Sequence, residues 1–180
     1  MSTLYYMKSR MELTANNGEW EELWEEYGPK LLLFARQQTE HESEAEDIVQ
    51  EAFVRYWRAR QKQPELSPTL LFTMVKRVSI DNARKARSRW QREIACYAGE
   101  DGEPVAWFDD PVEEKERQQQ LEAALRSIPP EQREVLVLKI WGGLTFEQIG
   151  ETLSISPNTA ASRYRYALNQ LRNVITAGVI

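Results

Sequence analysis

The sequence predicts an all-α protein made of two small helical domains joined by an acidic, flexible linker. Apolar residues recur at helical spacing along most of the 180 residues, and no strand-like alternation of apolar and polar residues persists. Glycine and proline number only eight each, and residues that favour helices dominate. A stretch rich in acids, glycine and proline interrupts the pattern after residue 92, which favours two domains over one.

The N-terminal domain is predicted over residues 18–92, after residues 1–17, which show no periodicity and are expected to be disordered. Its first helix spans about residues 19–38, where the apolar side chains follow helical spacing. The Gly28-Pro29 pair inside this helix should kink or break it, because proline lacks the amide that a helix interior needs.

Two further helices are predicted in this domain. Ser43 and Glu46 fit a capping box at the start of the second helix. A loop over residues 61–68 precedes the third helix, for which Ser67-Pro68 is a start signal. The apolar stripes of the two helices are Ala45, Ile48, Val49, Ala52, Phe53, Tyr56 and Trp57 in the second, and Leu71, Met74, Val75, Val78 and Asn82 in the third.

Charge is spread unevenly along the chain, whose net charge is −5. Residues 73–92 contain seven basic side chains and one acid, whereas residues 93–116 contain nine acids and one lysine. This asymmetry predicts a basic binding surface on the third helix beside an acidic linker, which we place at residues 93–111.

The C-terminal domain is predicted over residues 112–180. Its first helix ends at Pro129-Pro130, and a second helix runs until Trp141-Gly142-Gly143 stops it. Residues 144–168 then have the pattern of a short helix, a tight turn and a second helix, which is a helix-turn-helix. The last helix continues towards Thr176.

Each part of the helix-turn-helix carries a local signal. Thr145 and Gln148 form a capping box at the first helix. Gly150 permits a close approach of the second helix, and Ile155 is expected to be buried in the turn. Ser156-Pro157 suits the start of the second helix. Residues expected to face inward are Ala160, Tyr164, Ala167, Leu168 and Leu171, and those expected near the outer face are Asn158, Thr159, Ser162, Arg163, Arg165 and Tyr166.

The second helix of this motif has basic residues and no acid. Such a helix lies in the DNA major groove, where side-chain donors bind phosphates and base edges. The motif therefore predicts DNA binding, with an ordinary helical hairpin bearing a solvated basic face as the alternative. Taken alone, it leaves repressors, activators and response regulators open.

Catalytic and metal-binding signals are weak. One cysteine, Cys96, and one histidine, His41, exclude a disulfide framework and a Cys/His zinc cage built by this chain alone. No phosphate-cradling glycine loop or carboxylate cluster stands out, so no cofactor is expected and an enzyme is the least favoured class. The first ten residues lack the apolar core of a signal peptide and no apolar run could span a bilayer, so a cytoplasmic protein is expected.

Two stretches of the chain resemble bacterial RNA polymerase sigma factors of the extracytoplasmic-function (ECF) type. Residues 44–57 look like the signature helix of that family, and residues 128–138, 143–150 and Ser162-Arg163 resemble its C-terminal domain. The similarity spans about residues 20–171, with both motifs in the family's order. The resemblance implies a subunit that binds core RNA polymerase, recognises and helps to melt promoters, and is commonly held inactive by an anti-sigma factor.

The resemblance also implies two contacts for the N-terminal domain. The 44–57 helix would dock on the basic clamp helices of the polymerase's largest subunit through Asp47, Gln50, Glu51 and Arg55, with an ordinary solvated helix face as the alternative. The third helix and its preceding loop would bind the minus-ten promoter element, the loop capturing a flipped base. Its candidate residues are Lys62, Gln63, Ser67, Lys76, Arg77, Arg84, Lys85, Arg87 and Arg89. Arg77 stands where the family commonly has asparagine, which favours a phosphate contact.

The last helix would read the minus-thirty-five element, and here the chain departs from the family pattern. Ala160 and Ala161 stand where relatives often have valine and lysine, so Tyr164 is expected to fill the space beside Ala160. We expect Arg163 mainly to position the helix, while Asn158, Thr159, Ser162 and Arg165 face bases.

Two other function classes compete with this interpretation. A stand-alone regulator would not explain the 44–57 helix or the basic third helix. An adaptor that only sequesters a protein would need neither the basic surface nor an acid-free reading helix.

Overall fold

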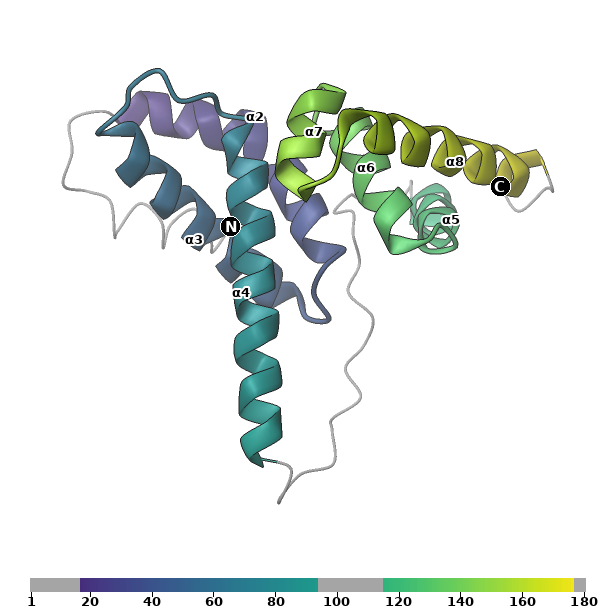
Figure 1. The fold of residues 1–180 in the computed structure, drawn as a ribbon, viewed down its shortest axis with the longest axis horizontal. Helices are drawn as coiled ribbons and strands as arrows, with labels where there is room; N and C mark the ends of the chain where they lie inside the picture. Colours follow the sequence, from purple (N-terminus) through teal and green to yellow (C-terminus); the bar gives the residue numbers. More distant parts are fainter. Residues whose placement is uncertain (1–16, 94–114, 177–180) are drawn as a thin grey trace. The chain divides into compact units, whose positions relative to one another are not determined.

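The computed structural model describes residues 17–93 and 115–176, with side chains described for residues 18–87 and 121–174. These ranges form seven α-helices (Figure 1), which confirms the all-α class. The helices are α2 (Asn17–Arg36), α3 (Glu42–Arg60), α4 (Leu70–Glu93), α5 (Lys115–Arg126), α6 (Pro130–Ile140), α7 (Phe146–Leu153) and α8 (Pro157–Thr176). No helix in these ranges is long and apolar enough to cross a membrane.

The chain divides into two compact units, residues 1–105 and 106–180. The predicted disordered start and acidic linker lie outside the described residues, apart from Asn17 and Glu93, which belong to helices. Cys96 also lies outside them. The domain limits 18–92 and 112–180 stay predictions.

The first unit is a three-helix core in which α2, α3 and α4 all contact one another. Phe34 of α2 meets Phe72 of α4 edge-on at 6.0 Å between ring centres, and Trp20 meets Phe53 of α3 at 4.9 Å. The predicted stripe of α4 is only partly right, because Met74 and Asn82 are half-buried whereas Phe72, Thr73 and Ser79 are buried. Since α4 is covered by both α2 and α3, it buries a wider face than one stripe.

Gly28-Pro29 does not break the first helix, because α2 runs through Pro29. Of the two outcomes expected there, the break is therefore wrong and the kink stays a prediction. Pro29 and Glu25, whose carbonyl loses its helical partner, are both exposed, so water can satisfy that carbonyl. The capping box predicted for Ser43 and Glu46 is wrong: α3 begins two residues earlier, at Glu42, with His41 in the cap position and no side-chain cap bond.

The start of α3 is fixed by an ion pair in place of that box. Arg36, buried at the end of α2, donates from Nη2 to Glu42 Oε1 at 2.6 Å. Glu42 lies in the first turn of α3, where a negative charge also suits the helix dipole. The pair therefore joins the end of one helix to the beginning of the next.

The second unit is built around α6, which contacts α5, α7 and α8. Four consecutive residues of α6, Val135–Leu138, are buried, because neighbours surround the helix. As predicted, Pro130 opens α6 and the helix stops before Trp141. Gly143 has a φ of +68°, a left-handed conformation that glycine adopts without strain.

Candidate nucleic-acid interface

The helix-turn-helix consists of α7, a short turn and α8. Its capping box is confirmed: the Gln148 amide donates to Thr145 Oγ1 at 3.2 Å, and the Thr145 amide donates to Gln148 Oε1 at 2.8 Å. Hydrogen bonds from the backbone amide of Glu147 and from the Thr145 hydroxyl also hold the pKa of Glu147 below its ordinary value. The capping box formed by Thr145 and Gln148 thus determines where the first helix of the motif starts.

The turn brings its backbone against Gly150. Ser154 adopts the left-handed conformation with a φ of 57°, and the Ile155 amide donates to the Gly150 carbonyl at 2.9 Å. A Cβ on Gly150 would lie 2.7 Å from the Ile155 carbonyl oxygen, so the predicted close approach is confirmed. Ile155 is only half-buried, contrary to expectation, whereas Leu144 and Ile149 nearby in the chain are fully buried.

The start of α8 is also capped as predicted. The Thr159 amide donates to Ser156 Oγ at 3.0 Å, and the two hydroxyl groups lie 2.8 Å apart. The Thr159 hydroxyl is therefore engaged by the cap, whereas Asn158 is exposed. The first turn of α8 is fixed in place before any ligand arrives.

One face of α8 is buried along a helical stripe. Ala160 and Ala167 are fully buried, and Tyr164 and Leu171 are half-buried. The Tyr164 ring meets the Phe146 ring of α7 edge-on at 5.8 Å, while its filling of the space beside Ala160 stays a prediction. Leu168 is 37% exposed and does not face inward as expected, because it flanks this stripe.

The predicted reading residues of α8 fall into two groups. Asn158, Thr159, Arg165 and Tyr166 are exposed, with 62% of Tyr166 accessible, whereas Ser162 and Arg163 are half-buried. Arg165 Nη2 donates to Ser162 Oγ at 3.3 Å within the helix. Arg163 instead forms an ion pair with Glu131 at the start of α6. Arg165 is therefore exposed on α8, whereas Arg163 is held by an ion pair with another helix of the same unit.

In the first unit, basic residues line the exposed side of α4. Arg77, Arg84, Lys85 and Arg87 are exposed and Lys76 is half-buried, while the side chain of Arg89 lies outside the described part. In the view of Figure 1 the C-terminal half of α4 extends past α2 and α3. A series of cations is therefore presented along a helix that solvent, or an anionic ligand, can reach.

The loop before α4 is ordered by hydrogen bonds at several points. The Lys62 and Gln63 amides both donate to the Ala59 carbonyl at 3.0 Å, and the Leu66 amide donates to the Gln63 carbonyl at 3.2 Å. The Tyr56 hydroxyl donates to the Leu66 carbonyl at 2.8 Å. The side chains of Lys62, Gln63 and Ser67 are exposed, so the three loop candidates lie at one accessible segment.

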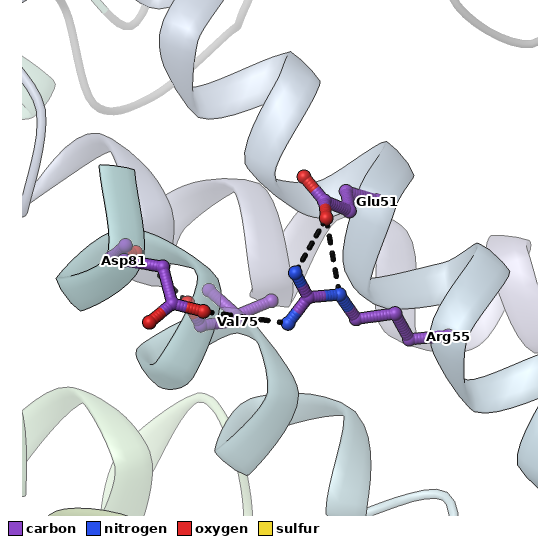
Figure 2. Close-up of polar contacts among 5 residues, drawn as sticks. Glu51, Arg55, Val75 and Asp81 are labelled. Atoms are coloured by element: carbon purple, nitrogen blue, oxygen red, sulfur yellow. Dashed lines mark hydrogen bonds and ion pairs between the residues drawn. The ribbon is translucent and has the colours of Figure 1, made fainter. Parts of the chain in front are cut away.

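The outer face of α3 carries the predicted polymerase-binding residues. Asp47 and Glu51 are exposed, while Gln50 and Arg55 are half-buried. Arg55 donates from Nε and Nη2 to Glu51 Oε1 at 3.1 and 2.6 Å, and its Nη1 lies 3.6 Å from Asp81 Oδ2 of α4. Figure 2 shows the guanidinium between these carboxylates, an arrangement that we call the Arg55 network. It carries one more negative than positive charge.

Three participants in these sites were absent from the sequence-based candidates: Tyr56, Asp81 and Glu131. Tyr56 was predicted as part of an apolar stripe. Its ring is buried as that predicts, but the hydrogen bond of its hydroxyl was not foreseen. Asp81 and Glu131 have partners 26 and 32 residues away along the chain. No local spacing indicates such pairs.

Comparison with known families assigns a class to this arrangement. Residues 23–89 match sigma-70 region 2, and residues 118–171 match sigma-70, region 4. The first match falls on the unit formed by α2–α4, and the second on the unit that contains the helix-turn-helix. The chain belongs to the sigma-70 family.

Individual relatives indicate which type of sigma factor the chain resembles. The chain is 31% identical over 161 residues to the ECF RNA polymerase sigma factor SigE of Mycolicibacterium smegmatis, covering 87% of this chain and 61% of that relative. It is 29% identical over 157 residues to the ECF RNA polymerase sigma factor SigL of Mycobacterium tuberculosis, covering 83% and 85%. Within the sigma-70 family the chain is thus similar to the ECF type of RNA polymerase sigma factor, and it spans 61% of the length of SigE.

A solved structure shares the fold. The sigma factor RpoE of Bartonella quintana, crystallised in complex with the anti-sigma factor NepR, superimposes with a TM-score of 0.63 at 21% identity. The match covers 88% of this chain and 97% of that one.

Proposed function

We propose that this chain binds core RNA polymerase, directs it to a class of promoters and helps to melt them. The polymerase contact is the exposed face of α3, where Asp47 and Glu51 suit the basic clamp helices of the largest subunit. Gln50 lies beside them. Arg55 lies at the edge of this face, where Glu51 and Asp81 already occupy its guanidinium.

The minus-ten element binds the 61–67 loop and α4. Lys62, Gln63 and Ser67 surround the position of a base flipped from the opening duplex, and the α4 cations neutralise the adjacent backbone. Exposed Arg77 contacts a phosphate. The minus-thirty-five element binds α8, where Asn158, Thr159, Ser162, Arg165 and Tyr166 reach the groove and Arg163 positions the helix.

One observation carries this proposal: a single compact unit presents both an acidic face on α3 and a basic face on α4, apart from the helix-turn-helix unit. A stand-alone DNA regulator has no use for the first unit. The protein acts without a catalytic group of its own, in the cytoplasm where polymerase and chromosome meet. An anti-sigma factor is its expected inhibitor, as NepR is the partner in the RpoE complex.

Run-off transcription with bacterial core polymerase on a genomic promoter library tests the proposal. Start sites that share an upstream element and depend on the added chain are expected. A Glu51→Gln chain should need a higher concentration for the same transcripts. If transcription does not rise above that of core polymerase alone on any fragment, the proposed function is wrong.

A further inference from the structure

The hydroxyl of Tyr56 makes a contact that packing alone does not require. Tyr56 is fully buried on α3, yet its hydroxyl donates a 2.8 Å hydrogen bond to the Leu66 carbonyl in the loop that precedes α4. A phenylalanine ring would fill the same space without that bond. The hydroxyl therefore serves the loop and not the hydrophobic core.

This bond joins residues that lie farther apart in the sequence than the other hydrogen bonds of the loop do. The Lys62, Gln63 and Leu66 amides find carbonyls three or four residues back, and Ser67 Oγ contacts Thr69 Oγ1 at 2.8 Å. The first two of these contacts continue the last turn of α3, and the others lie near the end of the loop, so none of them ties Leu66 back to α3. The Tyr56 bond spans ten residues and joins the loop to the helix whose outer face carries Asp47 and Glu51.

The carbonyl that accepts this bond belongs to Leu66, which directly precedes Ser67. Ser67 is one of the exposed loop residues expected to bind the minus-ten element. A loop that must receive an unstacked base gains from being fixed beforehand, because ordering it during promoter opening would oppose that step. We infer that Tyr56 is a positioning residue that holds the 61–67 loop in the shape that receives the flipped minus-ten base. This inference rests on the proposed function.

The experiment compares Tyr56→Phe with Tyr27→Phe in the full chain assembled with core polymerase. Tyr27 is a control for the loss of a phenol hydroxyl in the neighbourhood of Tyr56, since it is a partly buried phenol of the same unit that interacts with Tyr56 and whose own hydroxyl bonds with Glu26. The promoter is one found by run-off transcription. Its minus-ten bases are replaced one at a time by 2-aminopurine, whose fluorescence rises when the base leaves the stack.

We expect the Tyr56→Phe holoenzyme to capture the flipped base about three- to tenfold more slowly, the effect of one lost hydrogen bond. Its affinity for core polymerase should equal that of the wild type, and Tyr27→Phe should match the wild type in both assays. All assays run at a temperature at which circular dichroism shows each chain folded.

Three results would overturn the inference. Tyr56→Phe could capture the base as fast as the wild type, or it could lose as much affinity for core polymerase as it loses in base capture. The Tyr56→Phe chain could also fail to fold at any temperature. The last would show that the hydroxyl holds the fold and not the loop. Failure of the proposed function is distinguishable, because the wild-type chain would then give no fluorescence change on any promoter.

Discussion

The backbone of the turn between α7 and α8 leaves no room for a side chain at Gly150. We expect Gly150→Ala to lower the stability of the second unit by about 1–3 kcal/mol, because the turn must shift to admit the methyl group. Thermal unfolding followed by circular dichroism measures the change. Gly18→Ala is the control, since a Cβ there meets nothing within 4 Å and alanine favours a helix. Equal melting temperatures for the two variants would contradict the close approach.

The two arginines of α8 should differ in what they contribute to promoter choice. Arg165 is exposed, and we expect Arg165→Ala to cost about 1–3 kcal/mol at promoters with the preferred base and little at others. Arg163→Ala should weaken all promoters alike, because it loosens the helix from Glu131. Holoenzyme binding to a panel of minus-thirty-five variants distinguishes the two. A uniform loss for Arg165→Ala would remove its base-reading role.

Tyr56 should make the first unit sensitive to alkaline pH. Burial raises the pKa of Tyr56 above its ordinary value of 10.0, although nearby Arg60 opposes the shift. A raised folded-state pKa means that the neutral phenol contributes stability fully below about pH 10. That contribution is lost as pH rises through the folded-state pKa.

The stability difference between wild type and Tyr56→Phe reports chiefly on this residue, because Tyr27 is present in both chains and its pKa is raised first by burial and Glu26 and only then by Tyr56. Urea unfolding at a series of pH values measures it. The advantage of the wild type should shrink above pH 10. A difference that stays constant to higher pH would show that Tyr56 does not ionise in this range.

At the scale of helices, the Arg55 network joins α3 to α4 but should add little stability. Between 40% and 45% of each of its three side chains is exposed, and such pairs contribute about 0–1 kcal/mol. We expect Asp81→Asn to leave both unfolding and polymerase affinity nearly unchanged, whereas Glu51→Gln lowers polymerase affinity. Binding of labelled chains to core polymerase checks this. A large loss of affinity for Asp81→Asn would mean that the network sets the polymerase-binding face.

Helices and caps that depend on neighbours in sequence could be predicted, whereas contacts between helices could not. The Thr145-Gln148 box, the Ser156 cap and the stop before Trp141 use residues a few positions apart, so the sequence itself displays them. The Ser43-Glu46 box failed because α3 begins at Glu42, which pairs with Arg36 of the preceding helix, so that Ser43 lies inside the helix. The partners of Arg55 and Arg163 depend on how helices pack, which periodicity does not encode.

For the whole molecule, the net charge of −5 predicts weak binding to DNA in the absence of polymerase. We expect the free chain to give no promoter-specific complex in a mobility-shift assay at concentrations where the holoenzyme gives a clear one. The α4 cations and α8 then act only when polymerase holds both against one promoter. Tight, specific binding by the free chain would instead favour a stand-alone regulator.

The ion pair between Arg163 and Glu131 has a consequence for counterions. While Arg163 stays paired with Glu131 it contacts no phosphate, so it releases no counterion from DNA. Counting every cation of α8 would therefore overestimate how steeply the affinity falls as salt is added, by close to one phosphate contact. Part of the positive charge of this helix is already neutralised by the protein itself.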